Sequence, residues 1–452
     1  MTTTDLIIIG AGPGGYRAAE YAAEKGLRVV VFEGRHVGGT CLNEGCIPTK
    51  AFARNAEVMK TLANADVFGF DDVRYDFDFS RVVERKDQVI ENLRNGVETL
   101  LSQSGITLVK EEATFVDAKT IQTASGETFT APNIIIATGS EPKMPPFKDL
   151  DANVACDSSQ LLATTSLPRH LCIVGAGVIG MEFASIFNTF GCQVTVVEFL
   201  KECLPNVDSD IAKRLRKSLE KQGVEFFMQS AVSAVTANGV TFERKGKSTT
   251  IEADKVLIAV GRKPVLPKGV ETTGIAIDKT GIIVDDNMQT NIFGIYAIGD
   301  VNGRQMLAHA ATMQGLRAVN HMIANREKSI INCQLSIDDI RLDIMPAAIF
   351  TSPEVACVGK SEDQCKAEET SYICHKGYYR ANGKALAMGE TEGLVKLLTD
   401  NDGRLIGCHI LGAHAADLVQ EVAALMNRDT TIDQLRQITH IHPTLSEMLQ
   451  EL

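Results

Sequence analysis

The sequence predicts an α/β fold in which one strand–turn–helix–strand arrangement occurs twice and an α+β segment follows. Residues 6–15 and 171–180 both run from four apolar residues into a glycine-rich turn, and a helical pattern comes after each turn. Short apolar runs next to glycine clusters are typical of buried parallel strands. From about residue 338 these glycine patterns stop, and strand-like runs alternate with helical ones. A chain of 452 residues can hold two to four domains with cores of their own.

The first unit predicts a dinucleotide-binding turn. A strand over 6–9 leads into Gly10-Ala11-Gly12-Pro13-Gly14-Gly15, a helix over 16–25 follows, and a strand over 27–32 ends at Glu33. A glycine-rich turn before a helix lets a pyrophosphate approach the helix N-terminus, and an acid about twenty residues later can accept a hydrogen bond from a ribose hydroxyl. A plain tight turn with a solvated Glu33 is the alternative.

The second unit repeats this order. Gly175-Ala176-Gly177-Val178-Ile179-Gly180 follows a strand over 171–174, and a strand over 193–197 ends at Glu198. A carboxylate at this strand end favours a free ribose 2′-hydroxyl and repels a 2′-phosphate. No arginine occupies this position or the ones next to it, although Lys201 is near. The sequence therefore predicts NAD rather than NADP in the second unit.

Each unit closes with a further strand and glycine turn, at 134–139 and 256–261. Two copies of one design imply two dinucleotides, which is a stronger statement than either copy supports alone. The first unit also carries a long polar helix over 78–104 and strand-like pieces over 107–116 and 120–130.

The segment Gly38–Lys50 carries two cysteines, Cys41 and Cys46, around a short polar loop with one glycine. Pro48 follows, and an Ala-rich run after it has helical character, so Cys46 is expected at a helix N-terminus. The positive end of the helix dipole favours a thiolate there, and Lys50 adds a second positive charge one turn later. This pattern favours a redox-active disulfide. A zinc half-site and two unrelated buried cysteines are the alternatives, although no second Cys/His pair with ligand spacing follows.

Composition narrows the class of protein. The net charge of −12 argues against nucleic acid or an anionic membrane surface as the main partner. No run of eighteen apolar residues is present, and the N-terminus shows no signal-peptide pattern. Eleven scattered cysteines are not typical of a secreted disulfide framework. We therefore expect a cytoplasmic protein, in which a disulfide would be catalytic rather than structural, and we expect no metal.

The C-terminal segment ends on two histidines in His440-Ile441-His442-Pro443-Thr444-Leu445-Ser446-Glu447. A histidine with a glutamate five residues later can be a general base oriented by a carboxylate. From spacing alone, a surface histidine and a helix-capping acid are the more ordinary interpretation. Strands are expected over 347–350, 394–398 and 405–411, and helices over 415–426 and 432–437.

Taken together, the cysteine segment, the two glycine turns, the strand with its terminal Asp at 292–300 and the C-terminal histidine motif resemble the flavin-dependent disulfide oxidoreductases. That family includes dihydrolipoamide dehydrogenases, glutathione reductases and mercuric reductases, and the resemblance covers essentially the whole chain. It implies two Rossmann-like dinucleotide-binding domains, for FAD and NAD, and a C-terminal α+β dimerisation domain. The implied domains are 1–143 (FAD, first part, with the disulfide), 144–264 (NAD), 265–337 (FAD, second part) and 338–452 (dimerisation).

The same resemblance implies roles for individual residues. Cys41 would exchange with the substrate, Cys46 would pass electrons to the flavin, and His442, oriented by Glu447, would be the base for the partner subunit's disulfide. Lys50 and Glu182 would pair near the flavin and nicotinamide, with helix-surface charges as the alternative. The implied FAD contacts are Gly10, Gly12, Gly14, Gly15, Glu33, Gly39, Thr40, Lys50, Ala113, Thr138, Gly139, Ser140, Asp300 and Ala308. The implied NAD contacts are Gly175, Gly177, Val178, Ile179, Gly180, Glu198, Val232 and Gly261.

Within the family, Glu198, the cysteine segment and the C-terminal motif favour the dihydrolipoamide dehydrogenase branch, whose members oxidise protein-bound dihydrolipoyl groups with NAD⁺. The implied partners are a second copy of the chain and lipoylated domains of 2-oxo-acid dehydrogenase or glycine-cleavage complexes. Two features depart from the usual pattern of the family. Glu44 lies between the cysteines, and Glu111-Glu112 replaces a glycine-rich turn. The alternatives are a glutathione- or mercuric-reductase-like enzyme, or a flavoprotein that acts mainly as a binding subunit.

Overall fold

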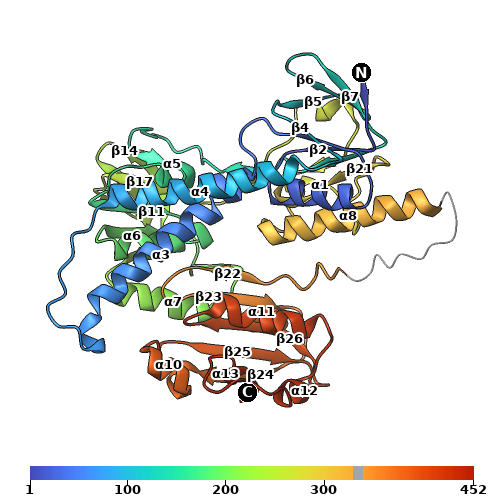
Figure 1. Cartoon of the computed structure of the whole chain (residues 1–452). Helices are drawn as coiled ribbons and strands as arrows, with labels where there is room; N and C mark the ends of the chain where they lie inside the picture. Colours follow the sequence, from blue (N-terminus) through green and yellow to red (C-terminus); the bar gives the residue numbers. More distant parts are fainter. Residues whose placement is uncertain (329–339) are drawn as a thin grey trace. The chain divides into compact units, whose positions relative to one another are not determined.

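The structure, a computed structural model, describes residues 1–328 and 340–452 (Figure 1). The predicted boundary between residues 337 and 338 lies outside these residues. The described chain forms two compact units. Unit 1 comprises Met1–Pro48, Glu84–Lys143 and Arg262–Leu342, and unit 2 comprises Thr49–Val83, Met144–Gly261 and Asp343–Leu452.

Unit 1 is built on a five-stranded parallel sheet of order β21-β8-β2-β3-β4. The strands are β2 (Leu6–Ile9), β3 (Val29–Phe32), β4 (Ile106–Val109), β8 (Asn133–Ile136) and β21 (Ile295–Ala297). All residues of β2 and β3 are buried, as expected for central parallel strands. Helix α1 (Pro13–Glu24) follows β2 and lies beside α8 (Ala308–Lys328) (Figure 1). A Cβ on Gly315 of α8 would lie 3.1 Å from the Ala18 Cβ, so glycine lets these helices approach closely.

The remaining strands of unit 1 form smaller sheets. A four-stranded sheet of order β1-β7-β6-β5 contains β1 (Thr2–Thr3), β5 (Ala113–Asp117), β6 (Thr120–Thr123) and β7 (Thr128–Thr130). The strand-like piece expected over 107–116 is thus two strands, β4 and β5, in two different sheets. Two-stranded pairs join β9 (Ser140–Pro142) to β18 (Arg262–Pro264) and β19 (Ile277–Asp278) to β20 (Gly281–Ile282). The 3₁₀ helices are η2 (Val270–Thr272) and η3 (Gly299–Asn302).

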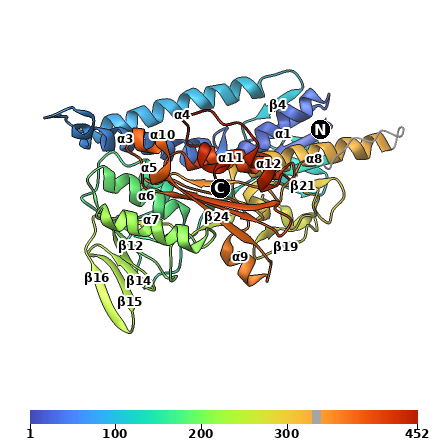
Figure 2. The same cartoon turned by 90° about the horizontal axis from the view of Figure 1, so that it is seen from below.

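Unit 2 repeats the parallel sheet with the same order of strands, β10-β17-β11-β12-β13. Here β11 corresponds to β2 and the closing strand β17 to β8, so the predicted repeat is confirmed. The strands are β10 (Ala155–Cys156), β11 (His170–Val174), β12 (Gln193–Val197), β13 (Glu225–Phe227) and β17 (Lys255–Ile258). The helices are α5 (Ser158–Leu162), α6 (Val178–Thr189) and α7 (Ser209–Lys221). An antiparallel sheet of β14 (Ala231–Thr236), β15 (Gly239–Arg244) and β16 (Lys247–Ile251) extends from it (Figure 2).

The C-terminal part of unit 2 is a five-stranded antiparallel sheet of order β22-β23-β26-β25-β24. The strands are β22 (Ala347–Ile349), β23 (Val355–Gly359), β24 (Ile373–Tyr378), β25 (Leu394–Thr399) and β26 (Leu405–Leu411). The helices are α9 (Glu362–Ala367), η4 (Tyr379–Ala381), α10 (Gly383–Met388), α11 (Ala415–Met426), α12 (Ile432–Arg436) and α13 (Glu447–Gln450). Lys396 is fully buried in β25 and donates to Asp208 at 2.6 Å, which ties this sheet to the start of α7.

The cysteine segment differs from the expectation. Most of the residues expected as a polar loop between Cys41 and Cys46 belong to a helix, α2 (Gly39–Glu44), and Gly45 ends it. The expected second helix begins at Cys46 and is α3 (Cys46–Ala63), followed by η1 (Ala65–Phe68). The long polar helix is α4 (Phe79–Leu101).

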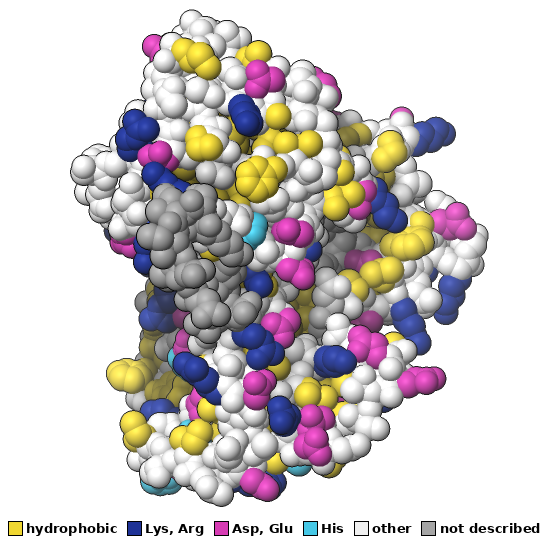
Figure 3. All heavy atoms as spheres, turned by 90° about the vertical axis from the view of Figure 1, so that its right-hand side faces the viewer, with side chains coloured by type: hydrophobic (Ala, Val, Ile, Leu, Met, Phe, Trp, Pro, Cys, Tyr) yellow, Lys and Arg dark blue, Asp and Glu magenta, His cyan; other side chains and the backbone are white. Residues whose placement is uncertain are grey.

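The surface carries both signs of charge, which are interspersed on the face shown in Figure 3. Among the described residues, no helix is long and apolar enough to cross a membrane. Large apolar side chains are exposed over α3, η1 and the following turn in unit 2, and one more is exposed on α10. We call these residues the apolar ridge: Val58, Leu62, Val67, Phe68, Phe70, Val73, Tyr75 and Leu386.

Candidate active site

The first glycine turn has the geometry of an anion cradle. Gly10 adopts a φ of +104°, and a Cβ on it would lie 2.4 Å from the Ala137 carbonyl oxygen, so only glycine fits between β2 and the end of β8. A Cβ on Gly15 would lie 1.9 Å from the Gly10 carbonyl oxygen. Gly12 caps α1 in an extended conformation, and Pro13 occupies the first helical position. The free backbone N–H groups of the first helical turn can therefore receive a pyrophosphate.

Helix α2 lies directly against this turn. A Cβ on Gly39 would lie 2.7 Å from the Gly12 Cα, so the missing side chain lets the two backbones meet. The Gly38 N–H donates to the Ala11 carbonyl oxygen at 2.8 Å. The half-buried Cys41 and Thr40 are thereby held beside the predicted FAD turn in the same unit.

The acids at the two strand ends have matching partners. The Glu33 carboxylate accepts from the Ala11 and Arg35 N–H groups, both at 2.8 Å. The Glu198 carboxylate accepts from the Ala176 N–H at 2.5 Å and the Leu200 N–H at 2.7 Å. Each acid therefore fixes its own glycine turn. Such a carboxylate keeps lone pairs for further donors, so the arrangement fits a nucleotide.

The second turn is built like the first. A Cβ on Gly175 would lie 2.5 Å from the Ala259 carbonyl oxygen, and one on Gly180 would lie 2.0 Å from the Gly175 carbonyl oxygen. Gly177 caps α6 in the same extended conformation as Gly12, with open space around its Cα. This space and the helix N-terminus fit a second pyrophosphate.

The end of β21, which leads to Asp300, is linked to the end of β8 through Ser140. Its hydroxyl donates to the Asp300 carboxylate at 2.5 Å and accepts from Arg262 Nε at 2.7 Å. Arg262 also donates to the Ser140 carbonyl oxygen at 2.7 Å. Thr138 donates to the Val265 carbonyl oxygen at 2.5 Å. These contacts place the predicted residues Thr138, Ser140 and Asp300 together, on the side of the sheet where β8 and β21 end.

Unit 2 brings Lys50 and Glu182 together. The Lys50 ammonium contacts both Glu182 oxygens, at 2.9 and 3.0 Å, and Glu182 is only 4 % exposed. The Phe350 N–H donates to the same carboxylate at 2.9 Å, and the Lys50 ammonium lies 4.6 Å from the centre of the Phe350 ring. A buried carboxylate needs such a cation and backbone donor to offset the loss of its hydration. The expected pairing of Lys50 with Glu182 is therefore present in the structure.

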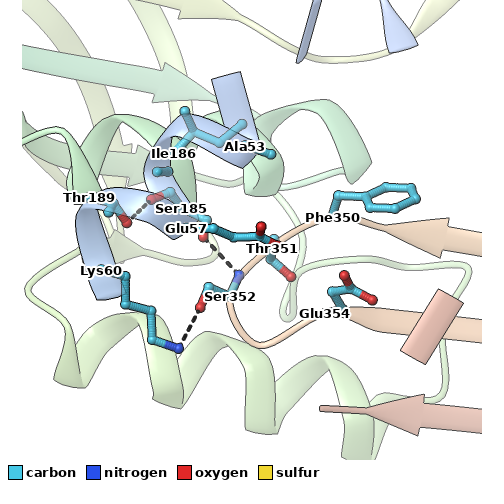
Figure 4. A pocket seen from close by; sticks show the side chains of 11 residues that line it. Ala53, Glu57, Lys60, Ser185, Ile186, Thr189, Phe350, Thr351, Ser352 and Glu354 are labelled. Carbon is cyan, nitrogen blue, oxygen red and sulfur yellow. Dashed lines mark hydrogen bonds between the residues drawn. The ribbon is translucent and has the colours of Figure 1, made fainter. Parts of the chain in front are cut away.

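A pocket lies next to this cluster, between α3, α6 and the turn after β22 (Figure 4). Several of the polar residues that line it are paired. The Ser352 N–H donates to Ser185 at 3.0 Å, and Lys60 donates to the Ser352 hydroxyl at 3.1 Å. Burial raises the pKa of Glu354, whose carboxylate accepts from the Ala416 N–H at 3.3 Å. These contacts fix the turn that carries Phe350, and with it the position of Lys50.

The two C-terminal histidines have different surroundings. His442 Nδ1 lies 2.8 Å from a Glu447 oxygen, and the His442 side chain is 82 % exposed. The Thr444 N–H, and then His442 itself, hold the pKa of Glu447 below its usual range. His440 is instead 5 % exposed and pairs with Glu421 at 2.7 Å. An ionised Glu447 on Nδ1 leaves His442 Nε2 as the basic nitrogen, directed away from its own pair.

The remaining residues predicted to contact FAD or NAD lie on or next to the strands and helices described above. Gly14 packs on α8, where a Cβ would lie 3.0 Å from the Ala311 carbonyl oxygen, and Ala308 begins that helix. Ala113 begins β5, and Gly139 and Gly261 follow β8 and β17 with positive φ angles. Val178 and Ile179 are the first residues of α6. Val232 lies in β14, just after Ser230, whose N–H donates to the Glu198 carbonyl oxygen at 2.8 Å.

Sequence reasoning missed three supporting residues. Arg262 holds Ser140, Phe350 holds Glu182 and Lys50, and Arg94 of α4 donates to the Asn43 side chain at 2.7 and 3.0 Å. Each acts across a long stretch of sequence, so no local pattern marks it. Among the described residues, no group of three potential metal ligands is present.

Two dinucleotide turns and a cysteine pair at a helix start define a class of oxidoreductases that move electrons between a nucleotide and thiols. Comparison with known proteins supports the same class. The family of pyridine nucleotide-disulphide oxidoreductases matches residues 4–315, and the dimerisation domain of that family matches residues 345–452. The chain belongs to this family, whose members use FAD and a pyridine nucleotide.

Similarity to individual relatives extends over the whole chain. Dihydrolipoyl dehydrogenase of Mycobacterium tuberculosis is 39 % identical, with 100 % of this chain and 97 % of the relative covered. Dihydrolipoyl dehydrogenase of Bacillus subtilis is 37 % identical, with 99 % and 97 % covered. Among solved structures, the HOCl-induced flavoprotein disulfide reductase RclA from Escherichia coli matches with a TM-score of 0.85 at 29 % identity, with 99 % of each chain covered.

Proposed function

We propose that the protein is a dihydrolipoyl dehydrogenase, which oxidises dihydrolipoyl groups to the cyclic disulfide and reduces NAD⁺ to NADH with release of a proton. The observation that carries the proposal is the complete set of chemical groups. Cys41 lies in α2, which packs on the first glycine turn, and Cys46 begins α3, while Lys50 pairs with Glu182 and His442 pairs with Glu447. Full-length similarity to relatives of that name supports the same substrate.

In the proposed reaction a thiolate of the substrate attacks Cys41 Sγ of a Cys41–Cys46 disulfide. The bond between the two cysteines breaks, and Cys46 leaves as a thiolate, which the N-terminus of α3 stabilises. The second substrate thiol then attacks the mixed disulfide, which releases the oxidised product and the Cys41 thiol. When bound, FAD supplies the chemistry that takes the electron pair from Cys46 and delivers it as hydride to NAD⁺.

His442 is proposed to take the proton from the attacking thiol and return it to the leaving one. Glu447 fixes the imidazole tautomer, so Nε2 is available for this transfer. Lys50 and Glu182 are proposed to orient the flavin and the nicotinamide. The ion pair keeps both side chains in one geometry without leaving an unpaired charge at the site.

We further propose that the enzyme is a homodimer in which His442 serves the disulfide of the partner subunit. The high exposure of His442 and the match to a dimerisation domain support this arrangement. The apolar ridge supports it too, because it adjoins the C-terminal sheet domain. Phe68 reaches within 3.8 Å of where a Gly389 Cβ would lie, and Lys60 pairs with Glu390 at 3.2 Å. Large exposed apolar side chains of this kind are typical of an interface.

The finer assignments from the sequence remain part of this proposal. The domains are 1–143, 144–264, 265–337 and 338–452. The substrate is carried on lipoylated protein domains, and the compartment is the cytoplasm.

Steady-state oxidation of dihydrolipoamide tests the substrate. The purified holoenzyme should reduce NAD⁺ with dihydrolipoamide and should be inactive with reduced glutathione in place of the dithiol. The reverse reaction is assayed with NADH or NADPH and either lipoamide or oxidised glutathione. Faster reduction of glutathione disulfide with NADPH would contradict the proposal and favour a glutathione-reductase-like enzyme.

Glu198→Arg is expected to shift nucleotide preference from NAD toward NADP. The change removes a carboxylate that repels the 2′-phosphate and adds a cation that can pair with it, worth about 1–3 kcal/mol or about five- to 150-fold in the affinity ratio. Direct titration with NADH and NADPH measures this ratio.

Glu198→Gln is the matched control for this substitution. An amide oxygen can still accept from the buried Ala176 N–H, so the glycine turn is kept while the negative charge is lost. This variant should bind NADH more weakly without a strong gain for NADPH. The interpretation of Glu198 is wrong if the unmodified enzyme already binds NADPH more tightly than NADH.

A further inference from the structure

The segment between the two cysteines carries a negative charge. Glu44 follows Cys41 by three residues in α2, so both side chains lie on one face of the helix, one turn apart. The Glu44 side chain is 27 % exposed and therefore only partly screened by water. A carboxylate at this range disfavours the thiolate form of a neighbouring cysteine.

Arg35 occupies the position that offsets this charge. Its guanidinium pairs with the Glu44 carboxylate. Its backbone is fixed, because the Arg35 N–H donates to the Glu33 carboxylate at 2.8 Å. The same acid that holds the first glycine turn thus also holds the residue that pairs with Glu44.

Other charged and titratable groups lie on or next to the cysteine segment. Tyr16 of α1 has a raised pKa, from burial and from the charge of a Cys41 thiolate. Arg94 of α4 reaches the segment through Asn43, which in turn donates to the Val37 and Gly39 carbonyl oxygens. His36 follows Arg35 on the exposed turn before α2. These groups are unchanged by substitutions at Arg35 or Glu44.

We propose that Arg35 is a positioning residue for the redox cysteines, which cancels the charge of Glu44 and so keeps Cys41 reactive as a thiolate near neutral pH. The proposal rests on the proposed role of Cys41 as the thiol that exchanges with substrate. It explains how this chain accommodates a carboxylate between its cysteines.

Alkylation of Cys41 tests the proposal without relying on turnover. The holoenzyme is reduced with NADH and treated with iodoacetamide across a range of pH, and the labelled Cys41 peptide is quantified by mass spectrometry. Arg35→Gln should move the midpoint of the rate profile upward by about half a pH unit, which is about threefold in rate below the midpoint. Glu44→Gln should move it downward, and the double variant should lie near the unmodified enzyme.

Arg28→Gln is the matched control. Arg28 pairs with Asp5 in the same unit, and the exposures of that pair, 67 % and 25 %, are close to the 70 % and 27 % of Arg35 and Glu44. This variant has the same change of net charge and should leave the profile unmoved. Because the pair is partly exposed, the Arg35→Gln shift should shrink in 1 M salt.

Two results would overturn the proposal. Profiles that coincide for Arg35→Gln and the unmodified enzyme would show that Glu44 does not act on Cys41. A double variant that keeps the full Arg35→Gln shift would show that Arg35 acts by another route. If Cys41 is not labelled after reduction in any variant, its role as the accessible thiol fails, and the proposed function is contradicted together with this inference.

Discussion

Replacing Cys41 or Cys46 by serine is expected to reduce dihydrolipoamide turnover to background while FAD stays bound. A hydroxyl cannot form the disulfide that accepts electrons from the substrate, and it is a far weaker nucleophile than a thiolate. Both variants should still oxidise NADH with artificial acceptors, because these take electrons from the flavin and bypass the thiols. Steady-state assays with both acceptors measure the separation.

The absorption spectrum separates the two roles. Cys46 is the first residue of α3, where the helix dipole stabilises a thiolate, whereas Cys41 lies in α2. A thiolate-to-flavin charge-transfer band is therefore expected in the Cys41→Ser variant, which keeps Cys46, and not in the Cys46→Ser variant. Identical spectra from the two would contradict the assignment.

Cys374→Ser is the control for this pair. Cys374 is half-buried like Cys41 and Cys46, but it lies in β24 of the C-terminal sheet. The same chemical change there should leave both turnover and spectrum unchanged. A loss of turnover equal to that of the other two variants would indicate a general effect of removing thiols.

The repeated nucleotide unit could be predicted from sequence because its signals are local. A glycine at residue 10 or 175 is required where the backbone has a φ above +100° and a carbonyl oxygen fills the place of a Cβ. The apolar strands and the terminal acids follow at fixed distances. The strand, the glycines and the acid of each unit lie within about thirty residues, which is the range over which a pattern can be read, although the carbonyl oxygens that meet the glycines belong to Ala137 and Ala259.

Helix α2 could not be predicted from its own residues. It has six residues, begins at Gly39 after a left-handed Gly38, and contains few strong helix formers. Its stability comes from elsewhere, because Arg94 of α4 holds Asn43 and the backbone of Gly39 packs on Gly12. A helix fixed by such distant contacts leaves no local signal.

The side-chain pairs at the site also show how far the sequence could predict contacts. Lys50 and Glu182 lie 132 residues apart, and only the family resemblance placed them together, with helix-surface charges as the alternative. Phe350 was not predicted, because its contribution comes from a backbone N–H that donates to Glu182 and from a ring face beside Lys50. For His442 and Glu447, five residues apart, spacing alone favoured a surface histidine and a helix-capping acid, and the family resemblance indicated the pairing that the structure contains.

His442→Gln is expected to reduce dihydrolipoamide turnover by about 10²–10⁴-fold, which is the usual effect of removing a positioned general base. A free thiol has a pKa of about 8.5, so at neutral pH the attacking thiol needs a base. Oxidation of NADH with artificial acceptors should persist, since no proton transfer at the thiols is involved. His414→Asn is the control, because His414 is also an exposed histidine beside a carboxylate, Asp417, in the same domain.

Mixing two inactive variants shows which subunit His442 serves. A dimer of one Cys41→Ser chain and one His442→Gln chain has one site in which Cys41 and His442 are both intact, provided that the base acts across the interface. Random exchange of equal amounts makes half of the dimers mixed, so recovery to about a quarter of the full activity is expected. If His442 serves its own subunit, every site in the mixture lacks one group and activity stays at background. Subunit exchange is verified independently by native mass spectrometry with chains of different mass, so that confirmed exchange without recovery contradicts the shared site.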